Sequence, residues 1–180
     1  GAILEKVSGV RFDRYVKDSV ITPLGLHAGH NIDELDMSKC ASIYHYSDGQ
    51  YVESNAYGSV AHKLNDYIMG YSAPMFSPTG GVKISAHDLA TYMMMHMNYG
   101  QLNGVRIISE ESAKTMQTPV WIKQTDDYYE DQYGLCLMEF VDFLDDPHYD
   151  TPGNYPVGHT GDAYGLRSIM IWSPADGWGI

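Results

Sequence analysis

The sequence predicts an α+β fold in which helices flank an antiparallel sheet. Apolar residues recur at helical spacing near the start and in the middle of the chain, whereas short alternating runs bounded by turn residues fill its end. Elements of one kind therefore follow one another in blocks, which favours separate helical and antiparallel layers. We expect one part of a single domain, with a helical start over 1–25, a hairpin and long excursion over 26–80, helices over 81–118 and antiparallel strands over 120–180.

Helices are predicted in two places. Between residues 3 and 20 apolar side chains recur every three or four positions, with one break at Gly9. The clearest helix is capped by Ser85 and stops at Gly100, and a second, short helix occupies 109–118. Three consecutive methionines in the first of these, 93–95, are expected to fill the core.

Strands are predicted on both sides of the central helices. Two alternating runs within 42–54 flank Asp48-Gly49, which is a strong hairpin signal. The tyrosines of this segment are expected to be half-buried, with a cleft-lining role as the alternative. Towards the end of the chain we expect strands at about 133–143, 157–159 and 165–172, and a last strand after the turn at Asp176-Gly177.

Composition and charge exclude several classes of protein. The 180 residues are 44% hydrophobic and 19% charged, which is typical of a globular chain. A net charge of −12 would repel phosphate backbones, so nucleic acid is excluded as a partner. No apolar run is long enough for a transmembrane helix. The two cysteines, Cys40 and Cys136, form no disulfide framework, and Cys136 is expected to be buried.

Two groups of residues resemble metal ligands, but neither predicts a metal site. His27 and His30 lie in a glycine-containing loop without a third ligand at fixed spacing. An acidic cluster lacks the ligand spacing and central glycine of a calcium loop, so we expect a solvated loop. Its members are Asp142, Asp145, Asp146, His148 and Asp150. The sequence therefore implies neither a metal nor a cofactor.

Three stretches, in order along the chain, resemble one family of enzymes. Residues 2–25 contain Glu-Lys-Val-Ser-Gly and then Pro-Leu-Gly, and residues 80–118 contain a Gly-Gly pair, a serine-capped helix and Arg-Ile-Ile-Ser. Residues 133–172 contain Tyr-Gly-Leu, Val-Gly-His-Thr-Gly and a closing strand. Together they resemble the serine β-lactamase-like and penicillin-binding-protein-like family, in its class C β-lactamase and esterase branch. The resemblance implies a partial serine β-lactamase/transpeptidase-like fold.

This family uses a nucleophilic serine in a Ser-x-x-Lys motif and a tyrosine in a Tyr-x-Asn motif. No serine here has a lysine three residues on, and neither Tyr44 nor Tyr46 fits the second motif. The family places both motifs ahead of the segment that residues 1–9 resemble. We therefore expect the chain to be the carboxyl-terminal part of a larger domain, without its nucleophile and inactive alone.

The resemblance locates one wall of the active site at His159-Thr160-Gly161. The triplet matches the family's Lys-Thr-Gly strand with histidine in place of lysine. Strand alternation puts His159 and Gly161 on one face and Thr160 on the other, and glycine lets an acyl group approach the backbone. By the same resemblance, the backbone N–H of Asp162 is an oxyanion-hole donor. We expect His159 on an edge strand, facing a cleft.

The resemblance implies a serine hydrolase that acts on D-amino-acid peptides, esters or lactams through an acyl-enzyme. Because histidine is at most partly charged near neutral pH, esters or peptides are favoured over lactams. The alternative is a non-catalytic module of the same fold that binds peptidoglycan or peptides. We expect a small-molecule or peptide substrate and self-association through the exposed edges of an incomplete sheet. A periplasmic or extracellular location is implied by the resemblance.

Overall fold

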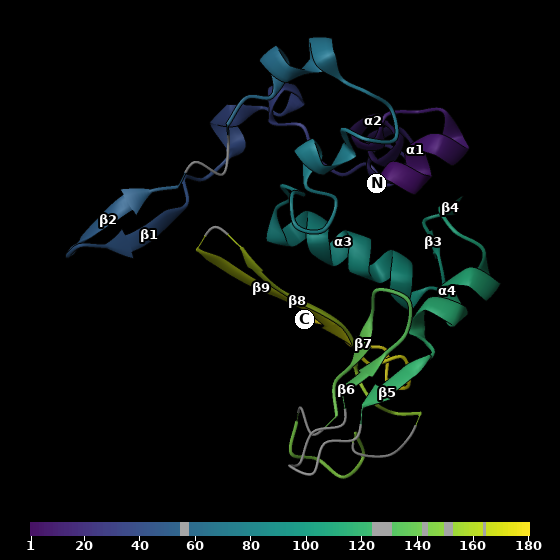
Figure 1. Cartoon of the computed structure of the whole chain (residues 1–180). Helices are drawn as coiled ribbons and strands as arrows, with labels where there is room; N and C mark the ends of the chain where they lie inside the picture. The colour runs from purple at the N-terminus through teal and green to yellow at the C-terminus, as the bar shows by residue number, and fades with distance from the viewer. Residues whose placement is uncertain (55–57, 124–130, 142–143, 150–152, 164) are drawn as a thin grey trace. The chain divides into compact units, whose positions relative to one another are not determined.

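The computed structural model describes residues 1–54, 58–123, 131–141, 144–149, 153–163 and 165–180 (Figure 1). They divide into two compact units. The first comprises Gly1–Asp88 and Gly161–Arg167, and the second comprises Leu89–Thr160 and Ser168–Ile180. Each unit has a cluster of buried apolar side chains of its own.

The first unit begins with the predicted helical segment. Helix α1 (Ala2–Ser8) ends at Gly9, whose φ of 69° forms the left-handed cap that glycine adopts most readily. Helix α2 (Phe12–Val16) continues into the π-helical turn η1 (Lys17–Ile21). The break at Gly9 confirms the predicted interruption. Phe12 packs against two buried residues of a later turn, Ala73 and Phe76, to form the core of this unit.

The predicted hairpin is confirmed. Strands β1 (Tyr44–Ser47) and β2 (Gln50–Glu53) pair antiparallel around a two-residue turn. Asp48 and Gly49 both have positive φ, 51° and 83°, as the turn best suited to a twisted hairpin requires. Short turns of 3-10 helix surround the hairpin in sequence: η2 (Ile32–Glu34), η3 (Met37–Lys39), η4 (Ala61–Asp66) and η5 (Ala73–Phe76).

Both predicted central helices are present. Helix α3 (Ala86–Met97) follows Ser85, whose hydroxyl accepts a hydrogen bond from the N–H of Asp88 at 3.0 Å. Helix α4 (Glu110–Gln117) is capped by Ser109. Between them lies a small hairpin of β3 (Gln101–Leu102) and β4 (Val105–Arg106). Met93 and Met95 are buried, as expected of core residues, whereas Met94 is 42% exposed.

A five-stranded sheet has the order β5-β6-β7-β8-β9, and its strands belong to the second unit except for the part of β8 and β9 within Gly161–Arg167. Its strands are β5 (Trp121–Lys123), β6 (Asp131–Tyr133), β7 (Met138–Glu139), β8 (Val157–Ala163) and β9 (Leu166–Trp172). The first four strands pair antiparallel. Helices together with an antiparallel sheet confirm the predicted α+β class.

The strand predicted over 133–143 is two short strands, and residues 142–143 lie outside the described residues. The chain turns between β6 and β7 because Gly134 approaches the end of α4, where an added Cβ would lie 2.1 Å from the carbonyl oxygen of Met116. Cys136 then adopts a φ of 62° and is exposed, while Leu137 is buried. The prediction of a buried Cys136 is therefore wrong. The last predicted strand is reduced to a single bridge between Trp172 and Gly179.

Candidate active site

His159 lies on β8 just beyond the part of that strand that pairs with β7. Met138 pairs with Gly158, and Glu139 pairs with Val157, so the register of β7 with β8 does not include His159. The exposure of β8 changes at the same point, because Val157 and Gly158 are buried and His159 is exposed. His159 and the residues after it therefore lie beyond the printed pairing with β7, while β9 is the neighbour of β8 on its other side. Because β8 lies between β7 and β9, it is not the edge strand that the sequence predicts.

The imidazole of His159 has two described contacts. Its Nδ1 lies within hydrogen-bond distance of the carbonyl oxygen of Thr160. A neutral histidine that uses Nδ1–H as the donor to this oxygen keeps a lone pair on Nε2, which can then accept a proton. The ring also meets Tyr133 of β6 edge to face, with 6.5 Å between ring centroids. These contacts orient the ring without burying it.

The residues that follow His159 continue along β8. Thr160 and Asp162 are exposed and Gly161 is half-buried. The carboxylate of Asp162 lies 3.1 Å from Nε of Arg167, on the neighbouring strand β9. Both side chains are largely exposed, so water screens this ion pair and its contribution to stability is small. The ion pair nonetheless directs the carboxylate of Asp162 toward β9.

Sequence reasoning missed two neighbours of the candidate strand, Tyr133 and Arg167. Tyr133 also contacts the ring of Trp121 at 6.1 Å, so an aromatic row crosses the sheet from Trp121 to His159. The contacts of Tyr133 and Arg167 with the candidate strand do not follow from spacing in the sequence. They depend on which residues of separate strands face each other. The sequence offered one indication of this neighbour: Tyr133, beside Gly134, is an aromatic residue of the kind that favours strands.

The rejected histidine pair lies in a loop, as the sequence suggested. His27 is exposed, while His30 is half-buried, with its Nδ1 3.2 Å from the carbonyl oxygen of Phe76. Burial lowers the pKa of His30 below its ordinary value. No group of three histidine, cysteine or acidic residues within the described ranges is arranged to hold a metal ion. Of the acidic cluster, Asp142 and Asp150 lie outside the described residues.

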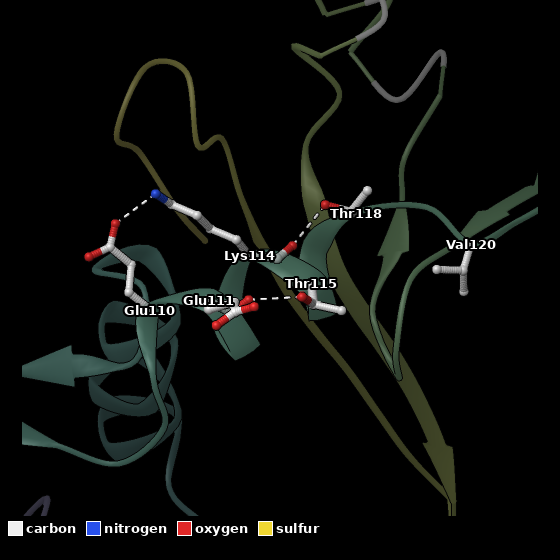
Figure 2. Close-up of a pocket in the computed structure, with 6 residues that line it drawn as sticks. All are labelled: Glu110, Glu111, Lys114, Thr115, Thr118 and Val120. Atoms are coloured by element: carbon white, nitrogen blue, oxygen red, sulfur yellow. Dashed lines mark hydrogen bonds and ion pairs between the residues drawn. The ribbon is translucent and has the colours of Figure 1, made fainter.

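A hollow on the surface of α4 is a different place from the candidate strand. Figure 2 shows its six lining residues, of which Glu110 and Lys114 point toward each other. Their ion pair measures 2.6 Å and follows the i,i+4 spacing of a helix surface. None of the four candidate site residues lines this hollow. Its lining holds no base placed beside a nucleophile, so it does not serve as the candidate active site.

Comparison with known proteins agrees with the predicted family and fold. The beta-lactamase family model matches residues 1–180. A protein of Escherichia coli O157:H7 that is named as a D-alanyl-D-alanine carboxypeptidase is 30% identical over 134 residues, which cover 66% of this chain and 29% of that protein. The solved structure of the octameric penicillin-binding protein homologue from Pyrococcus abyssi matches with a TM-score of 0.70 and 24% identity, covering 98% of this chain and 34% of that one.

The chain belongs to the beta-lactamase family, the class of serine hydrolases and penicillin-binding proteins. It has the fold of the penicillin-binding protein homologue. The chain spans about a third of the length of each of these two proteins. Among the described residues no helix is both long and apolar enough to span a membrane.

Proposed function

We propose that the whole protein is a serine hydrolase that cleaves D-amino-acid peptides or esters through an acyl-enzyme. In this proposal the present chain supplies the strand of the active site that carries His159. The observation that carries it is the sequence His159-Thr160-Gly161-Asp162 on β8, beyond the pairing with β7, with His159, Thr160 and Asp162 exposed. The family match over the full chain and the carboxypeptidase name of the relative support it.

The proposed reaction has two steps, and this strand acts in both. A serine oxygen forms a bond to the acyl carbon, the bond to the leaving group breaks, and the leaving group takes a proton. Water then attacks the acyl-enzyme and releases the acid. The N–H of Asp162 would stabilise the oxyanion in each step, and Nε2 of His159 would exchange a proton with, or donate a hydrogen bond to, the reacting groups.

Histidine at this position is expected to hold a substrate carboxylate less firmly than lysine would. A lysine in the triplet is a constant cation that can hold a substrate carboxylate, whereas histidine as a residue type is not a constant cation. We therefore propose esters and peptides ahead of lactams as substrates. A periplasmic or extracellular location would fit a peptide substrate of the cell wall, and self-association through sheet edges remains part of the proposal.

Trapping of the acyl-enzyme tests this function. The protein expressed from its full reading frame is incubated with benzylpenicillin, with p-nitrophenyl acetate and with acetyl-D-Ala-D-Ala, and its intact mass is measured. We expect one acyl adduct per molecule on the serine of a Ser-x-x-Lys motif, and no adduct on the 180-residue chain alone. Tight binding of the peptide without any adduct or turnover would instead indicate the non-catalytic binding module. A serine adduct within these 180 residues would contradict the role given to this chain.

A further inference from the structure

The ring of Tyr133, on β6, is a neighbour of the candidate imidazole within the second unit, to which both residues belong. The rings of Tyr133 and His159 meet edge to face with 6.5 Å between centroids. Aromatic pairs favour this arrangement because the positive edge of one ring meets the negative face of the other. Tyr133 can therefore orient the imidazole, to an extent that depends on how firmly Tyr133 itself is held.

The backbone of Tyr133 is held by β5, by the turn before β7 and by α4. β6 lies between β5 and β7 in the sheet (Figure 1). The carbonyl oxygen of Tyr133 accepts a hydrogen bond of 2.7 Å from the N–H of Val120. The next residue, Gly134, donates its N–H to the carbonyl oxygen of Leu137 at 2.8 Å. Gly134 also lies so close to the end of α4 that an added Cβ would collide with the carbonyl oxygen of Met116. The Cα position of Tyr133 is therefore well fixed.

The ring of Tyr133 is held as well. The register places Tyr133 opposite Trp121 on one side and opposite Met138 on the other. The rings of Tyr133 and Trp121 lie 6.1 Å apart between centroids, and the hydroxyl of Tyr133 donates to Sδ of Met138 at 3.6 Å. A thioether is a weak acceptor, so the contact with Met138 directs the ring more than it stabilises the fold. The ring is confined between an indole and a thioether.

The backbone next to His159 is fixed, but the side chain of His159 is not enclosed. Gly158 pairs with Met138, and a Cβ added to Gly158 would collide with the carbonyl oxygen of Met170 on β9. Glycine is thus required there by the close approach of two strands. His159 itself is exposed. Rotation of the imidazole about its side-chain bonds is the main freedom left at this position, and only specific contacts of the ring remove it.

Two contacts restrict that rotation. The carbonyl oxygen of Thr160 lies within hydrogen-bond distance of Nδ1 of His159, and the ring of Tyr133 packs against the imidazole. The carbonyl selects the neutral tautomer with its proton on Nδ1 for as long as the ring is kept turned toward Thr160. In that tautomer Nε2 is the nitrogen that can accept a proton.

We propose that Tyr133 is a positioning residue for His159, which holds the imidazole in the orientation that keeps the proton on Nδ1. Its effect on the imidazole rests on contacts within the second unit alone, whereas its consequence for turnover rests on the proposed function. A residue that orients a reacting group contributes to the rate because small misplacements of that group are costly. Tyr133 would thus act on catalysis through His159, without touching the substrate.

Nuclear magnetic resonance of the imidazole tests the positioning directly. The full-length protein is labelled with ¹⁵N-histidine, and the signals of His159 are identified by their loss in His159→Gln. At pH 8, where histidine side chains are ordinarily neutral, we expect one tautomer with its proton on Nδ1 and a nuclear Overhauser effect between the rings of Tyr133 and His159. Tyr133→Phe, which keeps the ring, should preserve this tautomer, whereas Tyr133→Leu should give a mixture of the two.

A second tyrosine–histidine pair of the same unit provides the matched control. Tyr149 and His148 also meet edge to face, at 4.8 Å between centroids, and His148 is exposed as His159 is. Tyr149→Leu should change the signals of His148 and leave those of His159 unchanged. Tyr133→Leu should do the reverse.

Turnover gives the second readout. With acetyl-D-Ala-D-Ala as substrate, we expect Tyr133→Leu to lower kcat about tenfold with little change in KM, because it misorients the reacting group and not the substrate. Tyr133→Phe should retain most of kcat. Tyr149→Leu should leave both constants unchanged.

The outcomes separate this role from the proposed function. Absence of the ring-to-ring effect in wild type, a measurement that needs no variant, overturns the positioning. His159 signals in folded Tyr133→Leu that equal those of wild type also overturn it, and so does a tautomer mixture in Tyr133→Phe as large as in Tyr133→Leu. Changed His159 signals in a protein that turns over no probe would leave the positioning standing and contradict the hydrolase.

Discussion

Two histidines of the second unit occupy opposite environments. His96, on α3, is 3% exposed, and its ring lies between Tyr92, edge to face at 4.8 Å, and Trp172, stacked at 5.9 Å. Its Nδ1 has no hydrogen-bond partner within the described part of the chain. His159 is exposed at the end of β8. The same side chain is therefore an aromatic packing element in one place and an accessible imidazole in the other.

Burial determines which of the two histidines can take part in acid–base chemistry. It lowers the pKa of His96 to about 4, because the charged ring would lose its water without gaining a partner. A ring that stays neutral and enclosed cannot exchange protons with a substrate.

Glu5 of the first unit shows a third arrangement, a buried charge with partners. Its carboxylate accepts hydrogen bonds from the N–H of Phe12, the N–H of Gly70 and the hydroxyl of Tyr67.

Replacing Glu5 should have the largest effect on stability. Burial opposes its ionisation, but the three hydrogen bonds outweigh burial and lower its pKa. Glu5→Ala would leave three donors without their acceptor, so we expect a loss of about 3–5 kcal/mol in the free energy of unfolding. Urea denaturation measures it, with the exposed Glu110→Ala, which removes only a surface ion pair, as a control that should lose far less. A loss no larger than that of the control would show that the Glu5 contacts are not what holds the first unit together.

The buried His96 should make the protein acid-labile over a defined range. Its pKa is about 4 in the folded chain, against 6.5 for an unperturbed histidine, so the unfolded state binds more protons between these values. Stability is therefore full above pH 6.5 and falls as the pH drops toward 4, by about 2 kcal/mol at pH 5. His96→Phe, which keeps an aromatic ring against Trp172, should flatten this part of the profile. His27→Phe, at an exposed loop position, should leave the pH dependence of stability unchanged. A pH profile in His96→Phe equal to that of wild type would contradict the assignment of the acid lability to His96.

Replacing Gly165 should lower stability by a smaller amount. Comparison with Gly104 separates the cost of positive φ from the cost of the contact with Tyr44. Gly165→Ala places a side chain at positive φ and against the carbonyl of Tyr44, whereas Gly104→Ala has nearly the same φ, 83°, with nothing within 4 Å. We expect positive φ to lower the free energy of unfolding by about 1 kcal/mol at either site, and the contact with Tyr44 to lower it further at Gly165. Thermal unfolding of the two variants gives the difference. Equal shifts in Tm for the two variants would mean that the hairpin does not contact this turn closely.

The sequence predicts elements whose signals are local and misses those set by packing. Asp48-Gly49 encodes its hairpin turn, and Ser85 encodes the start of α3, because neither needs a distant partner. Cys136 was placed wrongly because the turn before it is set by the approach of Gly134 to α4. The candidate strand was visible as His159-Thr160-Gly161, but its contact with Tyr133 depends on how separate strands pair, which the sequence does not specify.

His159 should matter least for stability and most for function. Its side chain is exposed and makes one ring contact, so His159→Ala should change the free energy of unfolding by less than about 0.5 kcal/mol. His96→Phe, by contrast, alters the core and its acid response without touching a reacting group. Comparing the two variants by urea denaturation and by turnover separates packing from chemistry. A large loss of stability in His159→Ala would place that ring among the structural contacts of the sheet.

The turnover of His159→Ala in the full-length protein tests the central claim most directly. The kcat/KM for acetyl-D-Ala-D-Ala and for p-nitrophenyl acetate is measured beside wild type and the exposed-loop control His27→Ala. If His159 exchanges protons with the reacting groups, its loss should lower kcat/KM by about a hundredfold or more, with native circular dichroism and an unchanged control. Kinetics equal to wild type on a substrate that the protein turns over would contradict the assignment of β8 as a wall of the active site.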